Sequence, residues 1–156
     1  MKDFMQKGVL ILKAITIKQP WASLITLGEK QFETRSWQTK HRGLLAIHAG
    51  KSVDKESCEN PWIKGVLREH GITSYKDLPT GVVLATVELV DCYKVEATVG
   101  YASVLSKGKT VNGLEVAFGD YTEGRYAWEL GNLQVLPQPV AVKGQLSLWE
   151  WHKEGV

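Results

Sequence analysis

The sequence contains few cysteines, no long apolar run and none of the common motifs of metal-dependent or nucleotide-cofactor enzymes. Its two cysteines, Cys58 and Cys92, are too few for a disulfide framework and lack the close spacing of a zinc site. A phosphate-binding glycine loop, a nucleophile elbow and a dinucleotide fingerprint are also missing. We therefore predict no metal site and no cofactor, so that any hydrolytic chemistry depends on general acid–base residues or on a lysine of lowered pKa.

Signals for secretion or membrane insertion are missing as well. The apolar run near the N-terminus is interrupted by Lys13 and is followed by no small-residue cleavage pattern. No segment approaches the roughly 20 apolar residues that a membrane-spanning helix needs. We expect a cytoplasmic protein without a membrane partner.

The composition is typical of one folded domain, since 44% of the 156 residues are hydrophobic and 23% are charged. We expect residues 1–156 to form this domain, with a flexible extension at 1–10 and a variable, loop-rich insertion at 94–123, where no clear period occurs. The net charge of +2 is unevenly distributed: residues 1–51 contain nine Lys/Arg and three Asp/Glu, whereas the remaining residues contain ten and fourteen. Such a basic section can attract phosphate, although a set of solvated lysines would have the same composition.

Hydrophobic periodicity and turn residues predict an α+β fold whose sheet curls into a small barrel. Strands alternate irregularly with few helices, and a Pro-Gln-Pro break at 137–139 separates the last two strands. The expected elements are strands at 12–17, 30–37, 44–50, 82–95, 124–136 and 142–151, a short helix between Pro20 and Gly28, and a helix capped by Asn60 that ends at His70.

The start of the first helix is a candidate ligand site. Gln19 and Pro20 place no Ser, Thr, Asp or Asn at the cap position, so backbone N–H groups need another partner. An anionic ligand can be that partner, with Lys18 beside it. Water or the side chain of Gln19 can equally satisfy these groups.

A second candidate group follows directly, at Lys30, Glu33, Arg35, Ser36 and Trp37. On a regular strand Glu33 and Arg35 point the same way, close enough to interact, whereas Lys30 points oppositely unless the strand begins after it or contains a bulge. Such a group can hold a phosphate or the polar edge of a base. A structural salt bridge is the alternative.

Further residues on and after this section can complete a binding site. Arg42, His48 and Lys51 add hydrogen-bond donors on or beside the next expected strand, although a single His in an apolar strand usually has a structural role. Four aromatic residues are candidates for stacking on a base, with core packing as the alternative for each: Trp21, Trp37, Tyr126 and Trp128.

The stretch ITIKQPWASLITLGEKQFETRSWQTKHRGLLAIHAGK resembles the start of the ASCH (activating signal cointegrator homology) domain of the PUA-like superfamily. The resemblance includes QPWASL and the G-x-K-x-x-E-x-R pattern at Gly28, Lys30, Glu33 and Arg35, and it continues in PTGVVLATVELVDC, GRYAWEL and VKGQLSLW. It implies a PUA-like β-barrel with helices packed outside, and a cleft at the G-x-K-x-x-E-x-R segment that binds RNA. We therefore expect RNA or a nucleoside as ligand.

The resemblance also leaves two alternatives. Some small bacterial ASCH proteins remove the acetyl group from N4-acetylcytidine with a lysine, a threonine and a glutamate, which makes Lys30 and Glu33 the catalytic candidates of a metal-independent hydrolase or ribonuclease. Lys30 matches the lysine, but Glu33 stands at the position of the threonine, Thr34 should face away, and Glu88 and Glu96 both remain candidates for the glutamate. The third hypothesis is a protein-interaction domain in transcription or translation regulation.

Overall fold

The computed structural model of the chain describes residues 4–6 and 8–154, in which nine strands form one mixed sheet. Among the described strands, only β2 and β4 pair in parallel, and the other neighbours are antiparallel. The central order is β9 (Leu148–Glu154), β2 (Val9–Gln19), β4 (Gly43–Val53), β5 (Val82–Val99), β8 (Tyr126–Ala141) and β3 (Phe32–Arg35).

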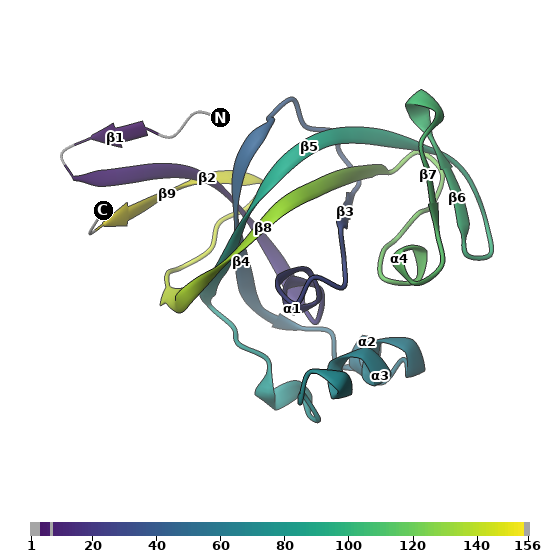
Figure 1. The fold of residues 1–156 in the computed structure, drawn as a ribbon, viewed down its shortest axis with the longest axis horizontal. Helices are drawn as coiled ribbons and strands as arrows, with labels where there is room; N and C mark the ends of the chain where they lie inside the picture. Colours follow the sequence, from purple (N-terminus) through teal and green to yellow (C-terminus); the bar gives the residue numbers. More distant parts are fainter. Residues whose placement is uncertain (1–3, 7, 155–156) are drawn as a thin grey trace.

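The sheet is curved but open. Figure 1 shows β5 and β8 as long strands that arch across the molecule, with the helices gathered below them. The pairing of the described strands makes β3 and β9 the edges of this order, and no ladder joins the two edges. The predicted α+β class is confirmed, whereas the structure shows an open sheet in place of the closed barrel that we expected. One side chain bridges the opening, because Arg35 Nη2 donates to the carbonyl oxygen of Thr16 at 2.8 Å.

Helix α1 (Trp21–Thr26) follows β2 directly, as the sequence predicts. Pro20 lies at its N-cap position, and Gly28, which follows the C-cap residue Leu27, has a φ of +81°. Ala22 and Ile25 pack into the main core under the curved sheet. The opposite flank of α1 contacts α2 (Lys55–Cys58) and α3 (Pro61–Glu69) through Leu24.

The predicted helix after Asn60 is confirmed as α3. Its first two N–H groups, those of Trp62 and Ile63, donate to Asn60 Oδ1, and His70 is the C-terminal cap. A 3₁₀ turn, η1 (Tyr75–Asp77), then leads into β5. No helix in the described part of the chain has the length and apolar character needed to cross a membrane.

Three regions differ from the expectations. Residues 94–123 contain the end of β5, then β6 (Ala102–Leu105), η2 (Ser106–Gly108), β7 (Thr110–Asn112) and α4 (Leu114–Ala117), elements too short to produce a clear period. The expected break at 137–139 lies inside β8, where a register shift opposite β5 accommodates the prolines. Within the expected extension 1–10, β1 (Phe4–Gln6) pairs with β2, while residues 1–3 and 7 lie outside the described part.

Candidate functional site

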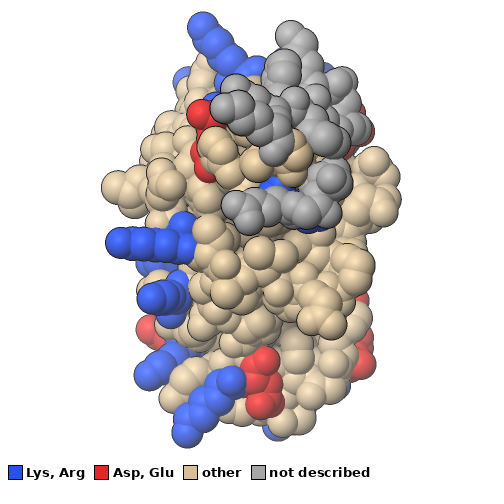
Figure 2. Space-filling model, turned by 90° about the vertical axis from the view of Figure 1, so that its left-hand side faces the viewer, with Lys and Arg blue, Asp and Glu red and all other residues tan. Residues whose placement is uncertain are grey.

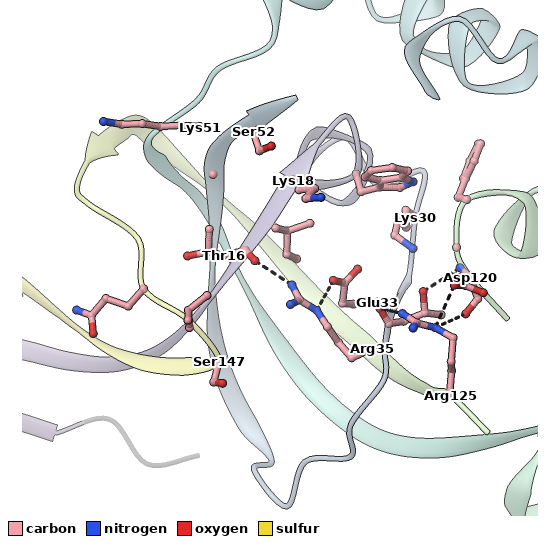
Figure 3. A pocket seen from close by; sticks show the side chains of 18 residues that line it. Thr16, Lys18, Lys30, Glu33, Arg35, Lys51, Ser52, Asp120, Arg125 and Ser147 are labelled. Atoms are coloured by element: carbon pink, nitrogen blue, oxygen red, sulfur yellow. Dashed lines mark hydrogen bonds and ion pairs between the residues drawn. The ribbon is translucent and has the colours of Figure 1, made fainter. Parts of the chain in front are cut away.

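A cavity of about 540 Å³ lies where the sheet fails to close. Strand β9 pairs with β2 only as far as Ile15, so the following residues of β2 form one wall, and β3 forms the opposite wall. This volume is within the range of about 300–1,000 Å³ that is common for small-molecule sites. The close-up in Figure 3 shows its polar lining, which comes from Thr16, Lys18, Lys30, Glu33, Thr34, Arg35, Lys51, Ser52, Asp120, Arg125, Gln145 and Ser147.

The lining of this cavity is predominantly positive. Two of its cations are paired within the cavity, Arg35 with Glu33 at 2.8 Å and Arg125 with Asp120 at 3.4 Å. Lys18, Lys30 and Lys51 form no ion pair with the described residues, and the two exposed ones, Lys18 and Lys51, leave an excess of positive charge. On the face that carries β1 and β9, Figure 2 likewise shows Lys and Arg side chains in a row along one edge. Both distributions favour an anionic ligand.

Lys30 has the most unusual environment in the cavity. Its side chain is only 2% exposed, and its Nζ has no hydrogen-bond partner among the described residues. Burial lowers the pKa of Lys30, while the nearby carboxylates of Glu33 and Glu115 act in the opposite direction. Because β3 begins only at Phe32, Lys30 lies in the preceding turn and shares the cavity with Glu33 and Arg35, one of the two outcomes left open by the sequence.

Glu115 is a functional candidate that sequence reasoning missed. It lies on α4 and accepts hydrogen bonds from the backbone N–H groups of Gln31 at 2.7 Å and Phe32 at 3.3 Å. Burial raises the pKa of Glu115, and the amino group of Lys30 lowers it. No local pattern links α4 to the turn before β3, because 84 residues separate Glu115 from Gln31.

Tyr121 lies close to the same carboxylates. Burial raises the pKa of its hydroxyl, and the charges of Glu115 and Glu33 raise it further. Its hydroxyl has no hydrogen-bond partner among the described residues. Glu115 and Tyr121 are close to Lys30 or Glu33 without being among the residues that line the cavity, and neither Glu88 nor Glu96, the two positions considered from the sequence for a catalytic glutamate, lines it.

A hydrogen-bond chain fixes the side of the cavity formed by β2. Thr16 Oγ1 accepts a hydrogen bond from Trp149 Nε1 at 3.0 Å and lies 3.1 Å from His48 Nδ1. His48 Nε2 lies 2.7 Å from the carbonyl oxygen of Val142, which can only accept, so Nε2 donates. His48 is 2% exposed and therefore has a structural position, holding the segment that leads to Gln145 in the cavity wall.

The structure brings five of the twelve predicted ligand-binding residues to this cavity. These are Trp21, Lys30, Glu33, Arg35 and Lys51. Thr34, which we expected to face away, also lines the cavity, and its Oγ1 accepts the N–H of Asp120. The other seven predicted residues are not in its lining: Gln19, Ser36, Trp37, Arg42, His48, Tyr126 and Trp128.

Gln19, one residue before the cap residue Pro20, is a structural residue outside the cavity lining. Its Oε1 accepts the N–H of Ser23 at 2.9 Å, and its Nε2 donates to Ser23 Oγ and to the carbonyl oxygen of Pro79. The side chain is fully buried. Of the N–H groups at the helix start, that of Ser23 is therefore satisfied by the alternative that we named, the Gln19 side chain.

Core packing accounts for two of the aromatic candidates. Trp128 is fully buried, and its ring packs edge-on against that of Trp37 with 4.8 Å between centroids. Tyr126 and Arg42 lie in a different cavity, and Ser36 is exposed on the surface. Trp21 is thus the single tryptophan among the described residues that line the larger cavity.

Sequence reasoning missed one wall of the cavity almost completely. Asp120 and Arg125 belong to the segment 118–125, and Gln145, Leu146 and Ser147 belong to the turn before β9. Neither segment carries a pattern that marks a ligand site, because each reaches the cavity only through the tertiary fold. Within the described residues, no three His, Cys, Asp or Glu side chains gather around a position for a metal ion.

Comparison with protein families and with curated proteins gives one consistent result. The model of a family described as the ASCH domain matches residues 15–137. Over 80 residues the chain is 40% identical to Activating signal cointegrator 1 from Homo sapiens and 41% identical to the protein of that name from Mus musculus. The match covers 50% of this chain but 14% of each relative, so this chain spans a small part of their length.

Proposed function

This chain belongs to the ASCH domain family, and we propose that the cavity between β2 and β3 binds a nucleotide, either free or within single-stranded RNA. The observation that carries the proposal is the excess of cations in a cavity of about 540 Å³ that has Trp21 in its wall. Cations that neutralise phosphate, together with an aromatic ring that stacks on a base, are the usual components of single-strand recognition. No metal or cofactor is needed for this function.

Individual residues have distinct roles in this proposal. Lys18 and Lys51, which form no ion pair with the described residues, neutralise phosphate. The guanidinium of Arg35 is already oriented by Glu33 and by the carbonyl oxygen of Thr16, so it presents a fixed donor group at little further entropic cost. Lys30 donates to the ligand and thereby acquires the partner that it lacks among the described residues.

Binding measurements with charge-removing variants test the proposal. We expect Lys18→Ala and Arg35→Ala each to weaken binding of a fluorescent single-stranded RNA, and to flatten the dependence of log Kd on log salt concentration. Lys76→Ala is a matched control, because Lys76 is an exposed lysine outside the cavity. Equal affinities of all variants with folded circular-dichroism spectra would refute the assignment.

A second candidate function is hydrolysis without a metal. Lys30, with its buried amino group, lies near two carboxylates, Glu33 and Glu115, and a buried amine of lowered pKa can take a proton from water. With N4-acetylcytidine as substrate, water adds to the acetyl carbonyl, the C–N bond breaks and the amine leaves as cytidine with a proton, releasing acetate. Liquid chromatography of the products would detect this turnover, with Lys30→Ala and Glu115→Gln as comparison variants. Equal product formation by wild type and Lys30→Ala counts against an enzyme.

A further inference from the structure

A second, smaller cavity of about 310 Å³ is lined by residues of β5, β8 and η2 and of the segment between β3 and β4. On one edge of β5, pairing with β4 ends at Leu89 and pairing with β6 begins at Val95, and the cavity opens beside the residues between them. Arg42 and Tyr126, two predicted ligand residues that are absent from the larger cavity, lie in this one. Its lining also includes Lys94 and Lys107, which the sequence did not single out.

The charge of this second cavity is positive. Arg42 Nη2 and Lys107 Nζ both contact one carboxylate oxygen, Asp91 Oδ1, at 3.1 and 2.8 Å. These contacts, led by the hydrogen bond from Lys107, lower the pKa of Asp91 and keep it ionised. Lys94 forms no ion pair with the described residues, so three cations face one anion. An excess of two positive charges remains for a ligand.

Several contacts hold these cations in place. Arg42 Nη1 donates to the carbonyl oxygens of Thr39 at 2.9 Å and His41 at 2.8 Å, which fixes the plane of the guanidinium. The N–H of Lys94 donates to Ser106 Oγ at 2.9 Å and joins η2 to β5. Lys107 has a φ of +60°, a left-handed conformation that residues other than glycine rarely adopt. The side chains of Arg42 and Lys107 are therefore held by hydrogen bonds, whereas Lys94 is held through its backbone.

The two cavities are connected by one row of paired residues across the sheet. Arg35 of β3 is opposite Tyr126 of β8, and Tyr126 is opposite Lys94 of β5. Directly paired residues point to the same face, and neighbouring strands are about 4.8 Å apart, which separates the outer two Cα atoms by roughly 10 Å. Arg35 of the first cavity and Lys94 of the second thus flank the ring of Tyr126. This arrangement suits a single-stranded RNA, whose phosphates contact cations while its bases stack on aromatic rings.

We propose that the second cavity is a phosphate subsite for single-stranded RNA, which contacts Arg42, Lys94 and Lys107 when a neighbouring nucleotide occupies the larger cavity. The inference rests on the proposed function and adds a direction to it: the strand crosses from Arg35 over Tyr126 to Lys94. A single nucleotide fills the larger cavity alone, so the subsite contributes only to longer ligands.

Ligand length therefore provides the test. We would measure the affinity of a fluorescent nucleoside monophosphate and of a six-nucleotide RNA, at several salt concentrations, for wild type and for Lys94→Ala/Lys107→Ala. The double variant should bind the monophosphate like wild type but bind the RNA more weakly. The slope of log Kd against log salt concentration should fall by about 0.7 for each phosphate contact that is lost. Lys13→Ala/Lys76→Ala removes the same charge from exposed positions outside both cavities and should change neither ligand.

A conservative variant separates charge from folding. Lys94→Arg/Lys107→Arg keeps both charges and should retain the RNA affinity and slope of wild type, and thermal unfolding of all variants would verify that they are folded. The subsite alone is overturned if the alanine double variant has the RNA affinity and salt slope of wild type while monophosphate binding is intact. If wild type binds neither ligand, the proposed function fails and the subsite fails with it.

Discussion

Replacing Lys30 by Met should stabilise the protein while it removes ligand binding. The lysine is 2% exposed and its Nζ has no hydrogen-bond partner among the described residues, a state that costs about 1–3 kcal/mol for a buried polar group. Methionine has a similar length and no polar atom, so it relieves this cost without leaving a large void. Glu115 keeps its two backbone N–H donors in the variant. We expect a gain of about 1–3 kcal/mol, which at this size raises Tm by about 2–4 °C per kcal/mol.

The pH dependence of this gain has a definite sign. Burial lowers the pKa of Lys30 in the folded protein from 10.5, so between the folded pKa and 10.5 the unfolded chain binds more protons at this residue. The free energy of unfolding therefore rises with pH in that window. Below the window Lys30 destabilises the fold most, because its amino group must then be buried with its charge. Met does not titrate, so the advantage of the variant should be larger near pH 7 than near pH 9.5.

Urea-induced unfolding, followed by tryptophan fluorescence at both pH values, measures this difference. Lys18→Met is the matched control, because Lys18 lies in the same cavity but is exposed, and its replacement should change stability by less than about 0.5 kcal/mol. A Lys30→Met protein no more stable than wild type would contradict the reasoning, as would an equal gain in Lys18→Met. Either result would mean that the amino group of Lys30 is well solvated in solution.

The remaining predictions concern stability and can share the same urea assay. Gly144→Ala should destabilise by about 1–3 kcal/mol, because a Cβ there would lie 2.6 Å from Thr16 Oγ1 and 2.7 Å from His48 Cε1. Asn60→Ala should cost about 1 kcal/mol through loss of the α3 cap, with the midpoint moving to lower urea. Gly65→Ala on the same helix should instead stabilise by about 0.5–1 kcal/mol, because nothing lies within 4 Å of the new Cβ. A destabilised Gly65→Ala, or an unchanged Gly144→Ala, would show that these local environments are misdescribed.

Local sequence patterns predicted much of the fold. The strand before Pro20, the short helix that ends at Gly28 and the helix capped by Asn60 each depend on signals within a few residues of the element. The pairing of Glu33 with Arg35 also follows from local geometry, since residues two apart on a strand share a face. These predictions agree with the structure because no distant contact overrides them.

The candidate site was predicted only in part, because it also depends on contacts between residues that are distant in the sequence. Lys30, Glu33 and Arg35 are close in sequence, and one motif indicated all three. Tyr126 was expected to share their site, but it lines the other cavity although it is paired directly with Arg35. Its sequence position carries no information about which of two cavities its ring enters, because the walls of both come from segments distant in the sequence.

By itself, the sequence determined the long strands, the helices α1 and α3, and that a basic motif follows the first helix. Tertiary structure alone decided that the sheet stays open, that α4 brings Glu115 to Lys30, and that Arg125 lines one cavity together with β2 and β3. The physical reason is sequence separation. Hydrogen bonds and side-chain periodicity act over a few residues, whereas a cavity wall depends on how far the sheet curves before its edges meet.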